Sequence, residues 1–208
     1  MTTNLIFDMD GTLIDSYDSI VDCIVKTNNH FNVENDRGFI REMIQKESTS
    51  YFFKFVSMNN KIEYEDLWNF YNNTEVDYSL IKLMPHAIEM FEALQERDVK
   101  NYVYTHRGPS VFKINKLLGI DRYLTEVVNL NNGFKRKPDP EGIDYLISKY
   151  NMQRNKTYYI GDRLLDQECA KNAGVNRVYY QSYKELSLDS KDYDYYLDDL
   201  LDITKIGF

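Results

Sequence analysis

Polar residues capable of chemistry follow three apolar segments that are rich in aromatic and β-branched residues. They are Asp8 and Asp10 after segment 5–7, Thr105 after segment 102–104, and Asp162 and Asp166 after segment 158–160. A single aspartate at such a position is usually a turn or helix-cap residue. Four aspartates in one place would repel one another unless a cation lay between them. Because carboxylates with no Cys or His nearby favour Mg²⁺ over Zn²⁺, the pattern predicts a magnesium site that bridges to a phosphate group.

The elements that must position these residues alternate along the chain. Strands are predicted over 5–7, 102–104, 124–128, 158–160 and 177–180, and helices over 87–96, 110–118, 141–149 and 164–172. This alternation predicts an α/β fold, a doubly wound parallel sheet of the Rossmann-like type with helices on both faces. Ligands of such sheets bind beyond the carboxyl ends of the strands, so the polar residues are expected to converge on one crevice.

The connection between the first two core strands is too long for a simple crossover. It contains about seventy residues, in which apolar side chains recur at intervals of three and four, the pattern of amphipathic helices. We therefore expect an inserted helical cap over residues 15–83 and a catalytic core over residues 1–14 and 84–208. A further helix is predicted near residues 195–201 of the acidic, Tyr-rich tail, to which no chemistry is assigned.

Composition and charge exclude several classes of protein. The formal net charge is -8 and the isoelectric point is about 5.0, which argues against nucleic-acid binding because phosphate backbones require a basic face. Cys23 and Cys169 stand far apart and suggest neither a disulfide framework nor a zinc site. The sequence shows no basic, apolar leader and no long apolar run, so we expect a cytoplasmic protein that does not bind membranes.

Four motifs occur in order along the chain. They are Asp8-Met9-Asp10-Gly11-Thr12, then Thr105, then Lys137 within segment 136–140, and finally Gly161-Asp162-Arg163-Leu164-Leu165-Asp166. This order resembles the haloacid dehalogenase superfamily of phosphatases, whose pattern is DxDxT, Ser or Thr, Lys, and GDxxxD. The resemblance spans nearly the whole chain. Its insertion lies between the first and second motifs, as in the subgroup with a helical cap.

The resemblance implies a role for each motif residue. Asp8 would be the nucleophile that forms an aspartyl-phosphate, and Asp10 the acid that protonates the leaving alcohol and then the base that activates water. Thr105 and Lys137 would bind the transferred phosphate. The Mg²⁺ ligands would be Asp8, the main-chain carbonyl of Asp10, Asp162 and Asp166.

Four further residues are candidates for substrate binding: Met9, Thr12, His106 and Arg107. Backbone N–H groups near Met9 and His106 would contact the phosphate, whereas Thr12 is better placed to hold the loop than to touch substrate. The family often has a small residue or Asn after the motif threonine. His106 and Arg107 depart from that form, so a substrate contact and a place at the rim of the site both remain open.

The predicted activity is magnesium-dependent hydrolysis of a small phosphorylated metabolite, either phosphoglycolate-like or a sugar phosphate, by a monomer or homodimer. Asp10 argues against dehalogenation, which has no leaving alcohol to protonate. One alternative is a phosphotransferase similar to β-phosphoglucomutase, although Ile20 stands where that enzyme has a histidine. The other alternative is a binding or regulatory module that retains the site without turnover.

Overall fold

The computed structural model of the protein describes residues 2–34, 36–183 and 188–207. The described chain divides into two compact units, one formed by Met1–Asp15 with Lys82–Phe208 and the other by Ser16–Ile81. We call the first the core unit and the second the helical unit. Within the described ranges, no helix is both long and apolar enough to cross a membrane.

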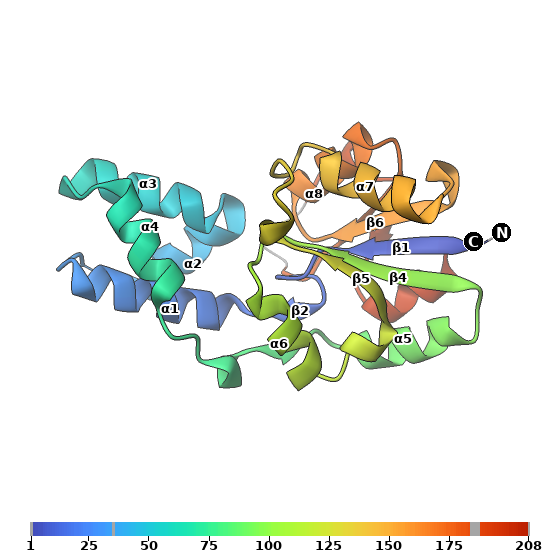
Figure 1. Cartoon of the computed structure of the whole chain (residues 1–208), viewed down its shortest axis with the longest axis horizontal. Helices are drawn as coiled ribbons and strands as arrows, with labels where there is room; N and C mark the ends of the chain where they lie inside the picture. Colours follow the sequence, from blue (N-terminus) through green and yellow to red (C-terminus); the bar gives the residue numbers. More distant parts are fainter. Residues whose placement is uncertain (1, 35, 184–187, 208) are drawn as a thin grey trace. The chain divides into compact units, whose positions relative to one another are not determined.

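A six-stranded parallel sheet forms the centre of the core unit (Figure 1). Its strands, in spatial order, are β5 (Leu124–Val128), β4 (Val99–Tyr104), β1 (Thr3–Phe7), β6 (Thr157–Gly161), β7 (Asn176–Tyr180) and β8 (Tyr195–Leu197). The first strand in the chain thus lies between β4 and β6. In a doubly wound sheet this reversal of strand order creates the crevice where ligands bind. The predicted α/β class and all five predicted core strands are confirmed.

Helices cover both faces of this sheet (Figure 1). They are α5 (Ala87–Gln95), α6 (Ser110–Leu117), α7 (Glu141–Tyr150) and α8 (Leu164–Asn172). Successive residues of a strand point to opposite faces. Ile6 therefore belongs to the cluster that contains Leu146 of α7 and Ala170 of α8, whereas the ring of Phe7 packs edge-on against Phe91 of α5 at 5.7 Å. The strand is buried on both sides, which explains its continuous apolar sequence.

The acidic tail is the part of the fold that the sequence predicted wrongly. The helix expected near residues 195–201 is instead the strand β8, parallel to β7, followed by a 3-10 helix at Leu200–Lys205. The ring of Tyr195 packs against Tyr158 of β6, and the ring of Tyr196 packs against Tyr179 of β7. Tyrosine favours a pleated surface with aromatic neighbours, and here the open edge of β7 outweighs the helical pattern.

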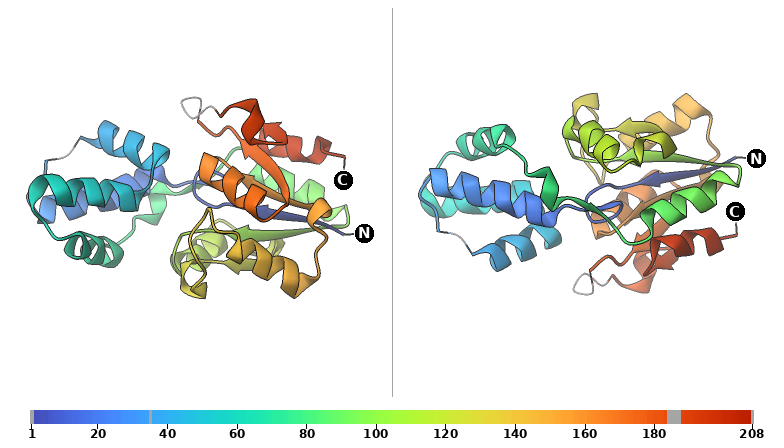
Figure 2. Two further views of the ribbon diagram at one scale, coloured as in Figure 1. Left: turned by 90° about the horizontal axis from the view of Figure 1, so that it is seen from above. Right: turned by 90° about the horizontal axis from the view of Figure 1, so that it is seen from below.

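The described residues of the helical unit form four α-helices and one 3-10 helix, Tyr78–Leu80. The α-helices lie together as a group (Figure 2). They are α1 (Tyr17–His30), α2 (Arg37–Lys46), α3 (Thr49–Asn60) and α4 (Tyr64–Asn73). The side chains of Asp36 and Ser48 accept hydrogen bonds from the first turns of α2 and α3. Phe53 is fully buried between the helices and contacts Trp68 and Tyr71 of α4 edge-on. A short antiparallel pair, β2 (Ile14–Asp15) with β3 (Lys82–Leu83), belongs to the core unit at the residues where the helical segment begins and ends.

Candidate active site

The loop after β1 is tied directly to the end of β6. The backbone N–H of Asp8 donates to the carbonyl of Ile160 at 2.8 Å, and the hydroxyl of Thr12 donates to Asp162 Oδ1 at 3.0 Å. Gly11 has φ +86°, and a Cβ at this position would lie 2.3 Å from Asp162 Oδ2. Glycine is therefore required both for the turn and for the close approach of the Asp162 carboxylate.

Asp8, Asp162 and Asp166 form a buried cluster at this sheet edge. One carboxylate oxygen from each lies within 4.8 Å of the others. Lys137 is also buried, and its Nζ donates to Asp8 Oδ1 at 2.5 Å and to Asp166 Oδ1 at 2.8 Å. Asp8 is more than a hundred positions from the other three predicted site residues, and the sheet brings all four together.

The charge and the polar atoms of the cluster fit a divalent cation. If all three carboxylates are ionised, the buried cluster carries three negative charges against the single ammonium of Lys137, an excess that a divalent cation would balance. Asp8 Oδ2 and Asp162 Oδ2 have no hydrogen-bond partner in the described part of the chain. Buried polar atoms are normally paired, so these two oxygens are the natural ligands of a cation. An all-oxygen donor set is the kind that Mg²⁺ prefers.

Burial dominates the protonation of the cluster when no cation is present. It raises the pKa of Asp162 from 3.8 to about 8, against the opposing charge of Arg163. Burial likewise raises the pKa of Asp8 to about 6, although Lys137 lowers it. For Lys137 itself, burial lowers the pKa, but the charges of Asp166 and Asp8 outweigh this and raise it overall. The lysine therefore stays charged, and a bound cation would keep the aspartates ionised.

Thr105 and Asp10 complete the edge of the site. Thr105 is buried at the end of β4, where its hydroxyl oxygen accepts a hydrogen bond from the backbone N–H of Arg107 at 3.1 Å. The Arg107 side chain crosses to Asp10, and its Nε lies 3.1 Å from each carboxylate oxygen. The structure thus places Arg107 inside the site and pairs it with a motif aspartate.

His106 contacts the segment that carries the lysine. Its Nε2 accepts a hydrogen bond from the backbone N–H of Lys137 at 2.8 Å. Burial, followed by the charges of Lys137 and Arg136, lowers the pKa of His106 to about 2, so the ring is neutral. Of the other two predicted substrate-binding residues, Met9 has a fully buried side chain and Thr12 is fully buried against Asp162, so neither side chain is exposed.

Two residues near the cluster were not anticipated from the sequence. The hydroxyl of Tyr159 donates to Asp166 Oδ1 at 3.2 Å, and Lys137 Nζ lies 5.2 Å from the ring centres of Tyr159 and Tyr104. Both rings present their faces to the ammonium, which stabilises a buried cation. In the sequence these tyrosines carry no signal beyond strand propensity.

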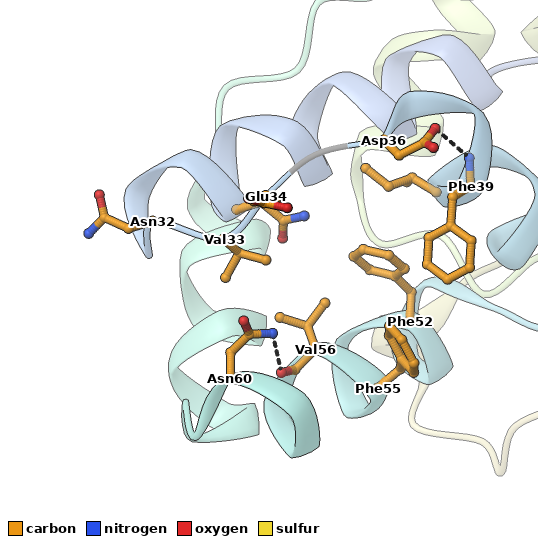
Figure 3. Close-up of a pocket in the computed structure, with 11 residues that line it drawn as sticks. Asn32, Val33, Glu34, Asp36, Phe39, Phe52, Phe55, Val56 and Asn60 are labelled. Atoms are coloured by element: carbon orange, nitrogen blue, oxygen red, sulfur yellow. Dashed lines mark hydrogen bonds between the residues drawn. The ribbon is translucent and has the colours of Figure 1, made fainter.

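The helical unit has a cavity of its own, with a volume of about 290 Å³ (Figure 3). Figure 3 shows the rings of Phe39, Phe52 and Phe55 along one side and Val56 and Asn60 along another. None of the predicted catalytic or metal-binding residues is among the described residues that line it. The buried cluster of Asp8, Asp162 and Asp166 lies in the core unit.

Known proteins resemble this chain over most of its length. A pyrophosphatase PpaX from Listeria innocua is 31% identical to this chain, and the match covers 82% of this chain and 79% of the relative. A second relative, described as a possible pyrophosphatase PpaX of Caldanaerobacter subterraneus, is 27% identical, and the match covers 98% of this chain and 94% of the relative. A predicted phosphoglycolate phosphatase from Haemophilus somnus has the same fold, with a TM-score of 0.83 and 21% identity over 99% of this chain and 97% of its own. The profile of the family described as haloacid dehalogenase-like hydrolase matches residues 5–180, and the chain therefore belongs to that family.

Proposed function

We propose that this protein is a magnesium-dependent phosphatase that hydrolyses a small phosphorylated compound through a phosphorylated Asp8. The observation that carries the proposal is the buried cluster in which Asp8 meets two further carboxylates and one lysine at the switch point of the sheet. A carboxylate surrounded by charge in this way is costly for the fold, and buried charge clusters of this kind are concentrated at functional sites.

The reaction proceeds in two displacements. An oxygen of the Asp8 carboxylate attacks phosphorus, the bond from phosphorus to the leaving oxygen breaks, and Asp10 gives a proton to that oxygen. Water then attacks the phosphorus of the aspartyl-phosphate and gives a proton to Asp10. The bond from phosphorus to Asp8 breaks, which releases inorganic phosphate and restores the carboxylate. Each displacement is easier than direct attack by water on the ester.

The residues around Asp8 would stabilise the charge that spreads over the phosphate oxygens. Lys137 is held beside Asp8 by Asp166 and by two aromatic rings, so its ammonium is already oriented before substrate binds. Thr105 presents a hydroxyl from the neighbouring strand end. A magnesium ion would be held by Asp8, Asp162, Asp166 and the main-chain carbonyl of Asp10, and it would supply electrostatic stabilisation of the transferring phosphate.

The substrates we propose are small and anionic. Phosphoglycolate-like compounds and sugar phosphates fit the resemblance to the family, and the curated relatives named pyrophosphatase add inorganic pyrophosphate. In each of these, one phosphoryl group is transferred and the rest of the molecule leaves through oxygen. The same two displacements at Asp8 therefore account for all three.

A substrate screen with a matched aspartate control tests the proposal. The purified chain should release phosphate from phosphorylated metabolites and from an artificial aryl phosphate when Mg²⁺ is present, and EDTA should stop the release. Asp8→Asn should lose at least about a thousandfold in kcat because the amide is not a nucleophile. Asp121→Asn alters an exposed aspartate at the amino-terminal side of β5 and should retain full activity. Turnover by Asp8→Asn at the wild-type rate would refute the nucleophile.

A further inference from the structure

Two cations that pair with the proposed reacting carboxylates have different partners. Lys137 pairs with Asp8 and Asp166, on the side of the nucleophile. Arg107 pairs with Asp10 through Nε, which lies 3.1 Å from both carboxylate oxygens, and through Nη2. These two side chains therefore place one positive charge beside the attacking carboxylate and another beside the acid–base carboxylate.

The Arg107 side chain is held at the site by its surroundings. It is only 11% exposed, and Asp10 is 20% exposed. The backbone N–H of Arg107 is anchored on Thr105 Oγ1, and its carbonyl accepts from the backbone N–H of Leu130. A guanidinium held so close to the end of β4 is oriented before substrate arrives, and less conformational entropy is lost when it binds an anion.

The position of Arg107 relative to the reaction follows from Asp10. In the proposed function, Asp10 must reach the oxygen that leaves, so a side chain in direct contact with both Asp10 oxygens lies beside the leaving group. The whole chain carries a formal net charge of -8, which repels anions. A cation at this point would offset that repulsion for a leaving group that is itself negatively charged.

We propose that Arg107 binds an anionic group on the leaving part of the substrate and so selects phosphorylated compounds whose leaving group carries its own carboxylate or phosphate. This inference rests on the proposed phosphatase function. The planar fork of a guanidinium matches the paired oxygens of carboxylate and phosphate alike. An anionic leaving group therefore offers Arg107 the same pair of acceptors that Asp10 offers in this structure, and Arg107 is a specificity-determining residue.

The test compares four substrates with Mg²⁺ in the full-length chain. Pyrophosphate and 2-phosphoglycolate have leaving groups that carry a phosphate or a carboxylate, whereas glycerol phosphate and p-nitrophenyl phosphate do not. For Arg107→Gln, the ratio of kcat/KM for anionic over uncharged leaving groups should fall about 10- to 100-fold from the wild-type ratio, mainly through KM. Arg107→Lys keeps the positive charge but not the planar fork of the guanidinium. Its ratio of kcat/KM should lie between those of the wild type and Arg107→Gln.

The control is Arg177→Gln, which removes a comparable arginine–aspartate pair at the opposite end of the sheet. Arg177 contacts Asp194 through Nε at 3.2 Å and Nη2 at 2.7 Å, near the start of β7. Its substrate ratio should equal that of the wild type. Thermal denaturation of each variant identifies any loss of fold, and if Arg107→Gln does not fold, the Arg107→Lys ratio decides.

The outcomes separate the two proposals. If Arg107→Gln lowers the relative kcat/KM for pyrophosphate alone, Arg107 binds a phosphate group. If it lowers the relative kcat/KM for 2-phosphoglycolate alone, Arg107 binds a carboxylate. An equal loss on all four substrates would overturn the Arg107 assignment and leave Arg107 as a residue that only positions Asp10. A wild-type chain that hydrolyses none of the four, and no sugar phosphate in the substrate screen, would refute the phosphatase function, and the Arg107 assignment with it.

Discussion

Asp162 should make the metal-free protein less stable as the pH rises. Its pKa in the folded chain is raised by burial from 3.8 to about 8. A group with a raised pKa stabilises the fold fully below its unfolded pKa, and this stabilisation is lost as the pH rises through the folded pKa. A bound divalent cation removes the penalty because it stabilises the ionised carboxylate.

The size of the effect follows mainly from Asp162 and His106, the buried groups whose proton binding differs most between the folded and the unfolded chain in this range. Asp8, whose pKa is raised only to about 6, adds a smaller loss. Between about pH 6 and about pH 8, the unfolded Asp162 is ionised while the folded one still largely holds its proton, which lowers the free energy of unfolding by about 2 kcal/mol. His106, whose pKa is lowered by burial to about 2, has the opposite sign, because an unfolded histidine binds a proton near pH 6 and the folded one does not. Over the same pH interval, His106 raises the free energy of unfolding by slightly less than about 1 kcal/mol. The net loss is about 1 to 2 kcal/mol, or about 2 to 8 °C in Tm for a chain of this size.

Thermal denaturation at about pH 6 and about pH 8, in EDTA and in saturating Mg²⁺, measures this directly. In EDTA, we expect Tm to be lower at about pH 8 than at about pH 6. The increase in Tm on adding Mg²⁺ should be larger at about pH 8. Asp162→Asn keeps an oxygen that accepts the hydrogen bond from Thr12, but its side chain cannot ionise. Its Tm in EDTA should therefore be the same or higher at about pH 8 than at about pH 6. An equal fall in the wild type and in Asp162→Asn would refute the assignment of the effect to Asp162.

Three substitutions test the packing around the cluster. Lys137→Met should abolish turnover and lower the free energy of unfolding by about 3 to 5 kcal/mol, because the buried carboxylates lose their paired ammonium. A free energy of unfolding equal to that of the wild type, measured by urea denaturation, would contradict this. Gly161→Ala should cost about 1 to 3 kcal/mol, since its Cβ would lie 2.3 Å from Cβ of Asp166, whereas Gly108→Ala has nothing within 4 Å and should cost less. His106→Ala should lower kcat about tenfold with little change in KM, because the backbone N–H of Lys137 loses its acceptor; a change in KM alone would assign His106 to substrate binding.

Much of the fold and of the candidate site could be predicted from local sequence. Continuous apolar segments predict buried parallel strands because both faces of the sheet are covered, and the observed strands contain those segments. Asp8, Asp162 and Asp166 could be expected to meet because the carboxyl ends of parallel strands share one edge. The prediction for the tail was wrong because β8 forms by pairing with β7. Local propensity does not describe such an interaction between two segments.

The sequence by itself determined which residue types were available for chemistry and on which strand ends they lie. Only the tertiary structure decided how they pair: that Arg107 holds Asp10, that His106 holds the backbone of Lys137, and that Tyr159 reaches Asp166. The physical reason is that ion pairing and burial depend on distances of a few ångströms between segments far apart in the chain. Strand order and loop path set those distances, and neither is written in the local pattern of residues.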